Sequence, residues 1–196
     1  MTSRPIKILG IPGSLRQQSY NRGLINAAQE VAPQGVEVTM YLLHDLPLYN
    51  ADVEAEGDPA EVTRFKNAIA EADAILIATP QYNASVPGVL KNAIDWASRR
   101  PRTGGDSVLA DKPVAIVGVT PGKSFTEPAQ IDLRKILKFT KSRVMPEPQV
   151  KLGAAPDRYS ENPELPDEET RQQIRAALDA LVEFITVAEA KAAAAD

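Results

Sequence analysis

Short apolar runs alternate along this chain with longer stretches in which apolar residues recur every three or four positions. The short runs are typical of strands buried on both faces, and the longer spacing is typical of helices with one buried face. The predicted strands occupy residues 6–11, 36–43, 74–78, 114–119 and 144–152. Their alternation with helices predicts an α/β fold, a three-layer sandwich with a five-stranded parallel sheet at its centre.

Five helices are expected, near residues 24–31, from 58 onward, over 86–99, around 131–139 and from 166 onward. The second is the best defined, because Asp58 is a capping acid and Pro59 suits the first helical position. The fifth strand is interrupted by Pro146 and Pro148. Since proline cannot donate to a β ladder, we expect that strand at an edge of the sheet.

Two loops, at about 44–58 and 153–166, are longer than most connections, and loops of this length are often functional. The segment Leu46-Pro47-Leu48-Tyr49-Asn50 in the first is apolar enough to pack over a site, although a surface loop with a small apolar cluster is an equal alternative. We expect one domain spanning residues 1–196, with an Ala-rich tail at about 188–196 that frays.

Composition excludes several classes of chemistry. The 196 residues include no cysteine and one histidine, His44, so thiolate chemistry is excluded and no metal site is expected. A net charge of -4 provides no electrostatic footprint for nucleic acid. No apolar run approaches the roughly 20 residues of a membrane span, and the first one is too short for a signal peptide. We therefore expect a cytoplasmic protein that binds neither nucleic acid nor membrane.

The loop after the first strand carries donors suited to a phosphate. It lacks both the G-x-G-x-x-G spacing of a dinucleotide fold and a Walker lysine. Hydroxyl, amide and guanidinium groups instead surround the start of a helix, where an anion is favoured. These groups belong to Ser14, Arg16, Ser19 and Asn21. A terminal monophosphate fits such a loop; the alternative is that Ser19 or Asn21 caps the helix and Arg16 is a solvated charge.

A second polar loop follows the third strand in the stretch TPQYNASVPGVLKNAIDWASR at residues 79–99. Tyr82, Asn83 and Ser85 therefore lie at the carboxyl end of a central strand. In open α/β sheets ligands bind at that edge. Together, the two loops predict a site for flavin mononucleotide (FMN).

Four segments resemble the NAD(P)H-dependent FMN reductases, a family that includes quinone, chromate and azo-dye reductases. They are GSLRQQSYNRGL at 13–24, LPLYNAD at 46–52, ADAILIATPQYNASVPGVLKNAIDWASR at 72–99 and TPG at 120–122. The resemblance implies a flavodoxin-like fold with sheet order 2-1-3-4-5 and FMN across the carboxyl edge. Two positions depart from the usual family pattern, since Gln81 stands where glutamate is usual and Ala84 where a larger residue is frequent.

The resemblance also implies the binding residues. The phosphate would be held by Ser14, Arg16, Ser19 and Asn21, and the ring and ribityl chain by Pro80, Gln81, Tyr82, Asn83 and Ser85. A third loop, Thr120-Pro121-Gly122, would border the ring. No catalytic side chain is expected, because the flavin carries the chemistry. His44 is expected to be a loop residue without a chemical role.

The predicted function is an NAD(P)H oxidoreductase that uses ping-pong hydride transfer to pass electrons through FMN to quinones, free flavin, chromate or azo compounds. The co-substrate would be NADPH or NADH, and the resemblance implies a homodimer or homotetramer. Arg99, Arg100 and Arg102 cluster at a predicted helix end, where cations are favoured; contact with the 2′-phosphate of NADPH is the alternative. A flavodoxin-type single-electron carrier and a flavin-free regulatory or scaffold protein are the alternative functions.

Overall fold

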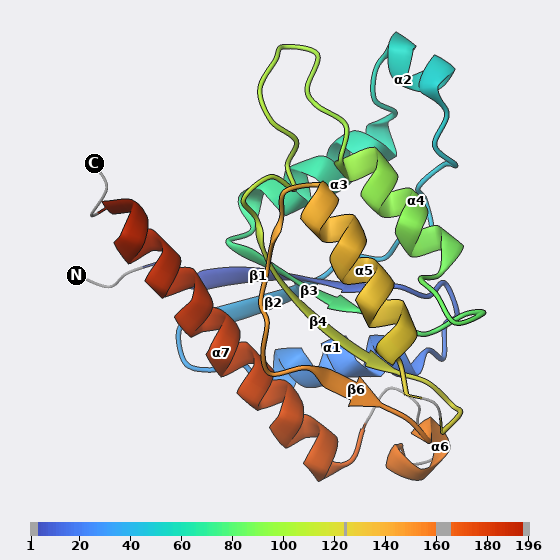
Figure 1. The fold of residues 1–196 in the computed structure, drawn as a ribbon, viewed down its shortest axis with the longest axis vertical. Helices are drawn as coiled ribbons and strands as arrows, with labels where there is room; N and C mark the ends of the chain where they lie inside the picture. Colours follow the sequence, from blue (N-terminus) through green and yellow to red (C-terminus); the bar gives the residue numbers. More distant parts are fainter. Residues whose placement is uncertain (1–3, 124, 160–165, 194–196) are drawn as a thin grey trace.

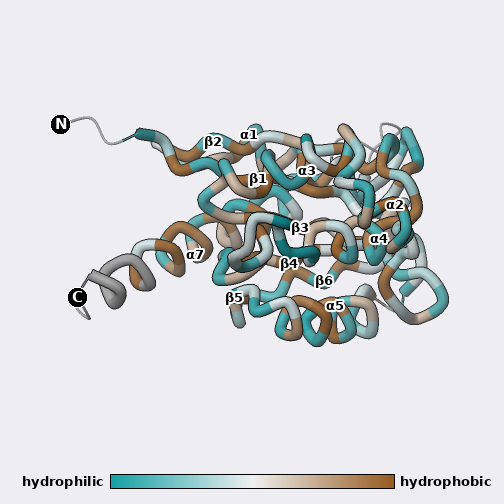
Figure 2. Tube along the Cα trace, turned by 90° about the horizontal axis from the view of Figure 1, so that it is seen from above, coloured by the Kyte–Doolittle hydropathy of each residue, from teal (hydrophilic) through white to brown (hydrophobic). Residues whose placement is uncertain are grey.

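The computed structural model describes residues 4–123, 125–159 and 166–193, the last six of these by backbone alone. Its strands are β1 (Ile6–Pro12), β2 (Val36–Met40), β3 (Ala74–Ala78), β4 (Pro113–Val119), β5 (Arg143–Val144) and β6 (Val150–Leu152). All pair in parallel, in the order β2-β1-β3-β4-β5, and β6 also pairs with β4. Figure 2, turned to look from above, shows the strands stacked in this order. The predicted α/β fold and sheet order are confirmed.

The helices are α1 (Tyr20–Glu30), α2 (Ala51–Glu56), α3 (Ala60–Glu71), α4 (Gly88–Ala97), α5 (Glu127–Phe139), α6 (Ala155–Arg158) and α7 (Glu168–Ala193). Figure 1 shows α7 as a long helix beside the sheet. The two short helices, α2 and α6, lie within the two longer loops and were not predicted. They are too short for apolar residues to recur at helical spacing.

The sheet is buried on both faces. Helices α1 and α7 cover one face, where Ile25 and Leu178 join a cluster with strand residues such as Leu76. Helices α3, α4 and α5 cover the other, where Phe65, Leu90 and Leu133 pack with the intervening strand residues. A parallel sheet covered on both faces needs apolar side chains at every strand position. This requirement explains the continuous apolar runs that made the strands recognisable.

Three local predictions were wrong. The fifth strand is two segments, because Pro146 and Pro148 lie between β5 and β6 and have no N–H to donate. The second strand ends at Met40 rather than at residue 43, because Met40 is the last residue of β2 that pairs with β1. Helix α3 has Pro59 at its N-cap without a side-chain hydrogen bond, and Asp58 instead pairs with Lys66 at 2.7 Å.

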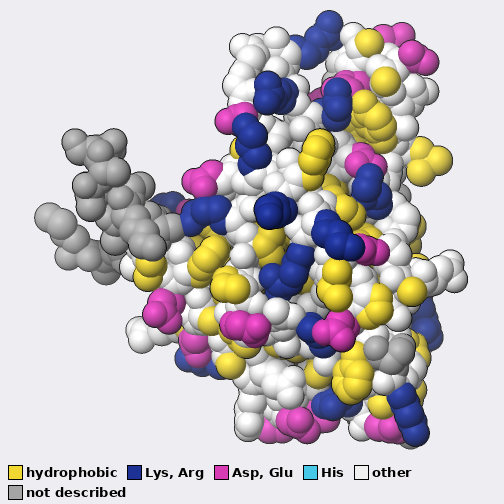
Figure 3. Space-filling model, in the orientation of Figure 1, with side chains coloured by type: hydrophobic (Ala, Val, Ile, Leu, Met, Phe, Trp, Pro, Cys, Tyr) yellow, Lys and Arg dark blue, Asp and Glu magenta, His cyan; other side chains and the backbone are white. Residues whose placement is uncertain are grey.

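The outer surface is mixed in character. Figure 3 shows Lys and Arg side chains interspersed with Asp and Glu over one face of the molecule. Two apolar residues of α5, Phe139 and Ile131, are 91% and 48% exposed. Within the described residues, no helix combines the length and apolar character needed to cross a bilayer. Helix α7 continues to Ala193. Of the tail for which fraying is predicted, the structure describes the backbone of residues 188–193, and residues 194–196 lie outside the described part.

Candidate functional site: the carboxyl edge of the sheet

A hollow of about 120 Å³, here called the carboxyl-edge hollow, opens where β1, β3 and β4 end. It is lined by Ser14, Arg16, Ser19, Tyr20, Asn21, Pro80, Tyr82, Val119 and Pro121. The structure therefore brings together seven of the twelve predicted binding residues. The other five lie outside its lining, on the loops that follow β3 and β4. They are Gln81, Asn83, Ser85, Thr120 and Gly122. Arg16 is the charged residue among those that line it.

The loop between β1 and α1 continues the sheet before it turns. The Gly13 amide donates to Ala78 O at 2.8 Å, one residue beyond the end of β1. A Cβ at Gly13 would lie 3.0 Å from Leu90 Cδ2, so a side chain there would crowd α4. Beyond the glycine, Ser14 Oγ accepts a hydrogen bond from the Arg16 amide at 3.2 Å. This hydrogen bond stabilises a turn over residues 14–16, at the edge of the hollow.

The amino end of α1 faces this hollow without a side-chain cap. Ser19 occupies the N-cap position and is 4% exposed, yet its side chain makes no capping hydrogen bond. The first N–H groups of an α-helix have no partner inside the helix. Together with the helix dipole, such groups favour an anion. The alternative in which the Ser19 side chain caps the helix is therefore not what the structure contains.

Asn21 faces the sheet rather than the centre of the hollow. Its side chain, 3% exposed, donates from Nδ2 to Val119 O at 2.9 Å and accepts from Val119 N at 3.1 Å through Oδ1. The ladder between β3 and β4 ends at Ala78 and Val117, so Asn21 takes over hydrogen bonding two residues further along β4. The predicted phosphate donor thus joins the first loop to the third.

The loop after β3 forms a tight hairpin. The amides of Tyr82 and Ser85 each donate to the other residue's carbonyl, at 3.1 and 3.0 Å. Asn83 and Ala84 between them have φ of 50° and 60°. Positive φ at both central residues is the requirement of a type I′ turn. Asparagine tolerates this region, whereas alanine adopts it only at a cost.

Two side-chain hydrogen bonds join this hairpin to other elements within the described part of the chain. On one side, Tyr82 Oη lies 3.4 Å from Ser14 Oγ in the loop between β1 and α1, here called the phosphate loop because of its predicted role. On the other side, Ser85 Oγ donates to Asp132 Oδ2 on α5 at 2.9 Å. Lys135 and, after it, Ser85 hold the pKa of Asp132 below its usual range by donating to its carboxylate. Asp132 is therefore ionised at neutral pH.

The remaining predicted residues flank these contacts. Gln81 is half-buried, and its Oε1 is buried without a hydrogen-bond partner among the described residues. Thr120 N donates to Leu152 O at 3.1 Å, and Gly122 O accepts from Ala154 N at 2.8 Å. The third loop is thus held by the end of β6 and by the segment that follows it. A buried carbonyl oxygen without a donor is unusual in a native structure and calls for an explanation.

Two residues that support the phosphate loop were missed by sequence reasoning. His44, predicted to have no chemical role, has Nε2 2.8 Å from Leu15 O. Because a carbonyl only accepts, the histidine nitrogen donates. Tyr159 donates its hydroxyl to Tyr20 O at 2.7 Å, and burial first of all raises the pKa of that hydroxyl far above its usual value. No local pattern reveals these partners, which are 29 and 139 positions apart in sequence.

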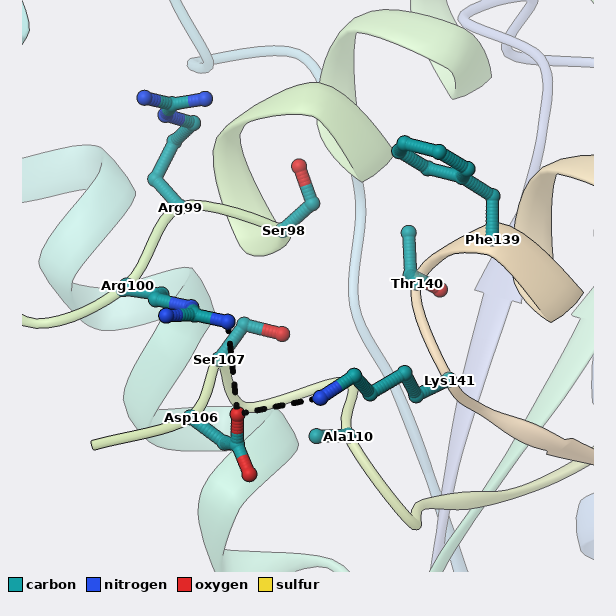
Figure 4. Close-up of a pocket in the computed structure, with 9 residues that line it drawn as sticks. All are labelled: Ser98, Arg99, Arg100, Asp106, Ser107, Ala110, Phe139, Thr140 and Lys141. Atoms are coloured by element: carbon teal, nitrogen blue, oxygen red, sulfur yellow. Dashed lines mark ion pairs between the residues drawn. The ribbon is translucent and has the colours of Figure 1, made fainter.

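A larger hollow, of about 270 Å³, lies at the opposite edge of the sheet (Figure 4). Its residues follow α4, precede β4 or follow α5, and they include Arg100, Asp106 and Lys141. Arg100 and Lys141 both approach Asp106 Oδ1, at 3.9 and 3.7 Å. The carboxyl ends of α4 and α5 attract cations on their own account. Arg99 and Arg100 line this second hollow and not the carboxyl-edge hollow. Arg99 also donates from Nε to Glu54 Oε1 at 2.8 Å.

A parallel sheet of this order, with a hollow at its carboxyl edge beside an uncapped helix, defines a flavodoxin-like α/β protein. The family model of the NADPH-dependent FMN reductases matches residues 6–157. This chain belongs to that family, as the sequence motifs predicted. The family is one of oxidoreductases, so the alternatives of a flavodoxin-type carrier and a flavin-free scaffold gain no support.

Individual relatives extend the match over nearly the whole chain. An NAD(P)H-dependent FMN reductase of Pseudomonas aeruginosa is 42% identical over 179 residues, covering 91% of this chain and 95% of the relative. An NAD(P)H:quinone oxidoreductase of Solanum tuberosum is 42% identical, with 92% and 94% covered. Among solved structures, the flavoenzyme NAD(P)H:(acceptor) oxidoreductase FerB from Paracoccus denitrificans superposes with a TM-score of 0.81 at 34% identity, covering 92% of this chain and 97% of FerB.

Proposed function

We propose that this protein is an FMN-dependent NAD(P)H oxidoreductase that reduces quinones, free flavin or related acceptors such as chromate and azo compounds. The observation that carries the proposal is the convergence of Ser14, Arg16 and Ser19 with Tyr82 around one hollow at the carboxyl edge. The names of the bacterial and plant relatives support the same class of reaction.

The donors around α1 fit a phosphate monoester. Ser14 and Ser19 offer hydroxyls, the open first turn of α1 offers backbone N–H groups, and Arg16 offers a guanidinium. A compact dianion requires such convergent donors, and charge-assisted hydrogen bonds are the stronger ones. Asn21 is assigned to positioning, because both of its amide atoms bond Val119.

The loops beside the hollow fit the flavin ring and its sugar-alcohol chain. Tyr82 is 51% exposed at the rim and offers an aromatic face, and Pro80 and Pro121 offer apolar surface. Gln81 Oε1 is buried and has no donor among the described residues, and the flavin ring carries an N–H group that would supply one. Asn83, Thr120 and Gly122 complete the proposed contacts on the loops after β3 and β4. Ser85 is assigned to positioning, because its hydroxyl donates to Asp132.

The chemistry that FMN would supply when bound is acceptance of a hydride from a nicotinamide and transfer of the electrons to the second substrate. The chain's own part is to bind, orient and exclude water. The hairpin from Tyr82 to Ser85 is held from both sides, which fixes the wall of the site. Neither a cysteine nor a histidine is required for hydride transfer, which agrees with a chain that has no cysteine and a single histidine engaged by Leu15.

The test is an FMN titration of the purified protein, followed by NADPH and NADH oxidation with a quinone acceptor. We expect micromolar or tighter FMN binding and acceptor-dependent oxidation of the nicotinamide. Arg16→Ala should weaken FMN binding about tenfold, the factor that ~1.4 kcal/mol represents. Arg100→Ala is the matched control, because Arg100 lies at the opposite edge of the sheet. Failure of the unmodified protein to bind FMN would overturn the proposal.

We further infer that the chain works as a homodimer or homotetramer. Support comes from large apolar side chains left exposed, with Phe139 at 91% and Leu48 at 84%. Burial of these two side chains in a contact between copies would remove their apolar surface from water, which is favourable. Sedimentation equilibrium of the flavin-loaded protein tests the inference, and a monomer at micromolar concentration would contradict it.

A further inference from the structure

The Asp132 carboxylate of helix α5 contacts the loop after β3, which is proposed to hold the flavin ring. Ser85 Oγ donates to Asp132 Oδ2 at 2.9 Å, while Lys135 Nζ donates to the other oxygen, Oδ1, at 3.1 Å. Asp132 therefore has one oxygen for the hairpin and one for its own helix. The Ser85 contact crosses 47 positions of sequence, and no motif in the chain predicts it.

The hairpin that Asp132 holds needs an external support. Its tip contains two consecutive residues at positive φ, Asn83 and Ala84, and both are exposed. Asparagine tolerates this conformation, but for alanine it is costly and persists only where surrounding contacts enforce it. The contact on the far side, between Tyr82 Oη and Ser14 Oγ, is 3.4 Å long and thus weaker than the Ser85 bond.

We propose that Asp132 is a positioning residue for FMN, acting through Ser85 to hold the hairpin 82–85 in the conformation that receives the flavin ring. The inference rests on the proposed function, and it adds a residue of α5 to a site otherwise built from the loops after β1, β3 and β4. Asp132 neither lines the carboxyl-edge hollow nor belongs to the binding motifs. Its effect is transmitted by one hydrogen bond, so removing either partner has the same consequence.

The first test measures FMN affinity. Asp132→Ala and Ser85→Ala should each weaken FMN binding about fivefold, and the double variant should be no weaker than either single one, because both remove the same bond. Asp132→Asn keeps an oxygen that accepts from Ser85 and should restore most of the affinity. Lys135→Met is the matched control, since it removes only the Oδ1 partner. We expect Lys135→Met to bind FMN as the unmodified protein does.

The second test needs no flavin. Hydrogen exchange of the apo-protein should show the amides of Tyr82 and Ser85, which close the hairpin, exchanging at least about fivefold faster in Asp132→Ala. Lys135→Met should leave them unchanged. If the protein binds FMN and Asp132→Ala changes neither affinity nor exchange, this inference fails while the proposed function stands. If no variant or parent binds FMN, the proposed function fails, and the exchange result alone decides whether Asp132 holds the hairpin.

Discussion

Asn21→Ala offers the sharpest test of how the phosphate loop is held. The substitution removes a donor and an acceptor that bond Val119 at 2.9 and 3.1 Å, and Asn21 is 3% exposed. Val119 N and the lone pair of Val119 O that faces Asn21 would both lose their partner. A buried polar group left unpaired costs about 1–3 kcal/mol. We therefore expect the free energy of unfolding to fall by about 2–4 kcal/mol, with water entry giving the lower end.

The loss can be measured by urea unfolding of the apo-protein, which avoids the linkage between FMN binding and stability. Trp96 is the single tryptophan and is fully buried, so its fluorescence reports unfolding. For a chain of this length the expected loss lowers Tm by about 6–12 °C. Asn21→Ala should also weaken FMN binding, because the first loop is then no longer joined to the third.

Asn26→Ala is the matched control, since Asn26 is a half-buried asparagine further along the same helix. Alanine is the better helix former, so the control should be neutral or stabilising by a few tenths of a kcal/mol, about 0.5 at most. An Asn21→Ala protein as stable as Asn26→Ala would refute the reasoning. It would show that the Val119 groups find water or another partner at no cost.

Two further predictions concern strain and acid stability. Ala84→Gly should raise the free energy of unfolding by about 0.5–1 kcal/mol, because relief of the left-handed conformation exceeds the entropy that glycine adds to the unfolded chain; a lower urea midpoint would contradict the strain assigned to Ala84. Asp73 receives the Arg4 guanidinium at 2.6 and 2.7 Å and the Lys7 amide at 2.8 Å, and Arg4 first of all holds the pKa of that carboxyl below its usual range. Its contribution to stability is present above the unfolded pKa of about 3.9 and is lost as the pH falls through the lower folded value. Asp73→Asn should therefore flatten the pH dependence of the urea midpoint in that acid range, and an unchanged slope would rule out this assignment.

Predictions from the sequence were wrong where the surroundings of a residue mattered more than its type. Asp58 has the chemistry of a helix cap, yet Lys66 takes its carboxylate and Pro59 occupies the cap position. An apolar side chain such as that of Phe139 is usually buried. Phe139 is the last residue of α5, however, and its side chain is 91% exposed. In both cases the residue type was informative, while its surroundings decided the outcome.

The sequence by itself determined the layered α/β architecture and the two loops that carry the candidate site, and its resemblance to a known family implied the order of the sheet. The architecture was recognisable because burial on two faces imposes an apolar run on the central strands of a parallel sheet, as in the fully buried β3 and β4. Only the tertiary structure decided that Asn21 bonds Val119, that Asp132 holds Ser85 and that His44 supports Leu15. Hydropathy is a property of neighbouring positions, whereas a hydrogen bond between elements depends on how the helices and strands pack.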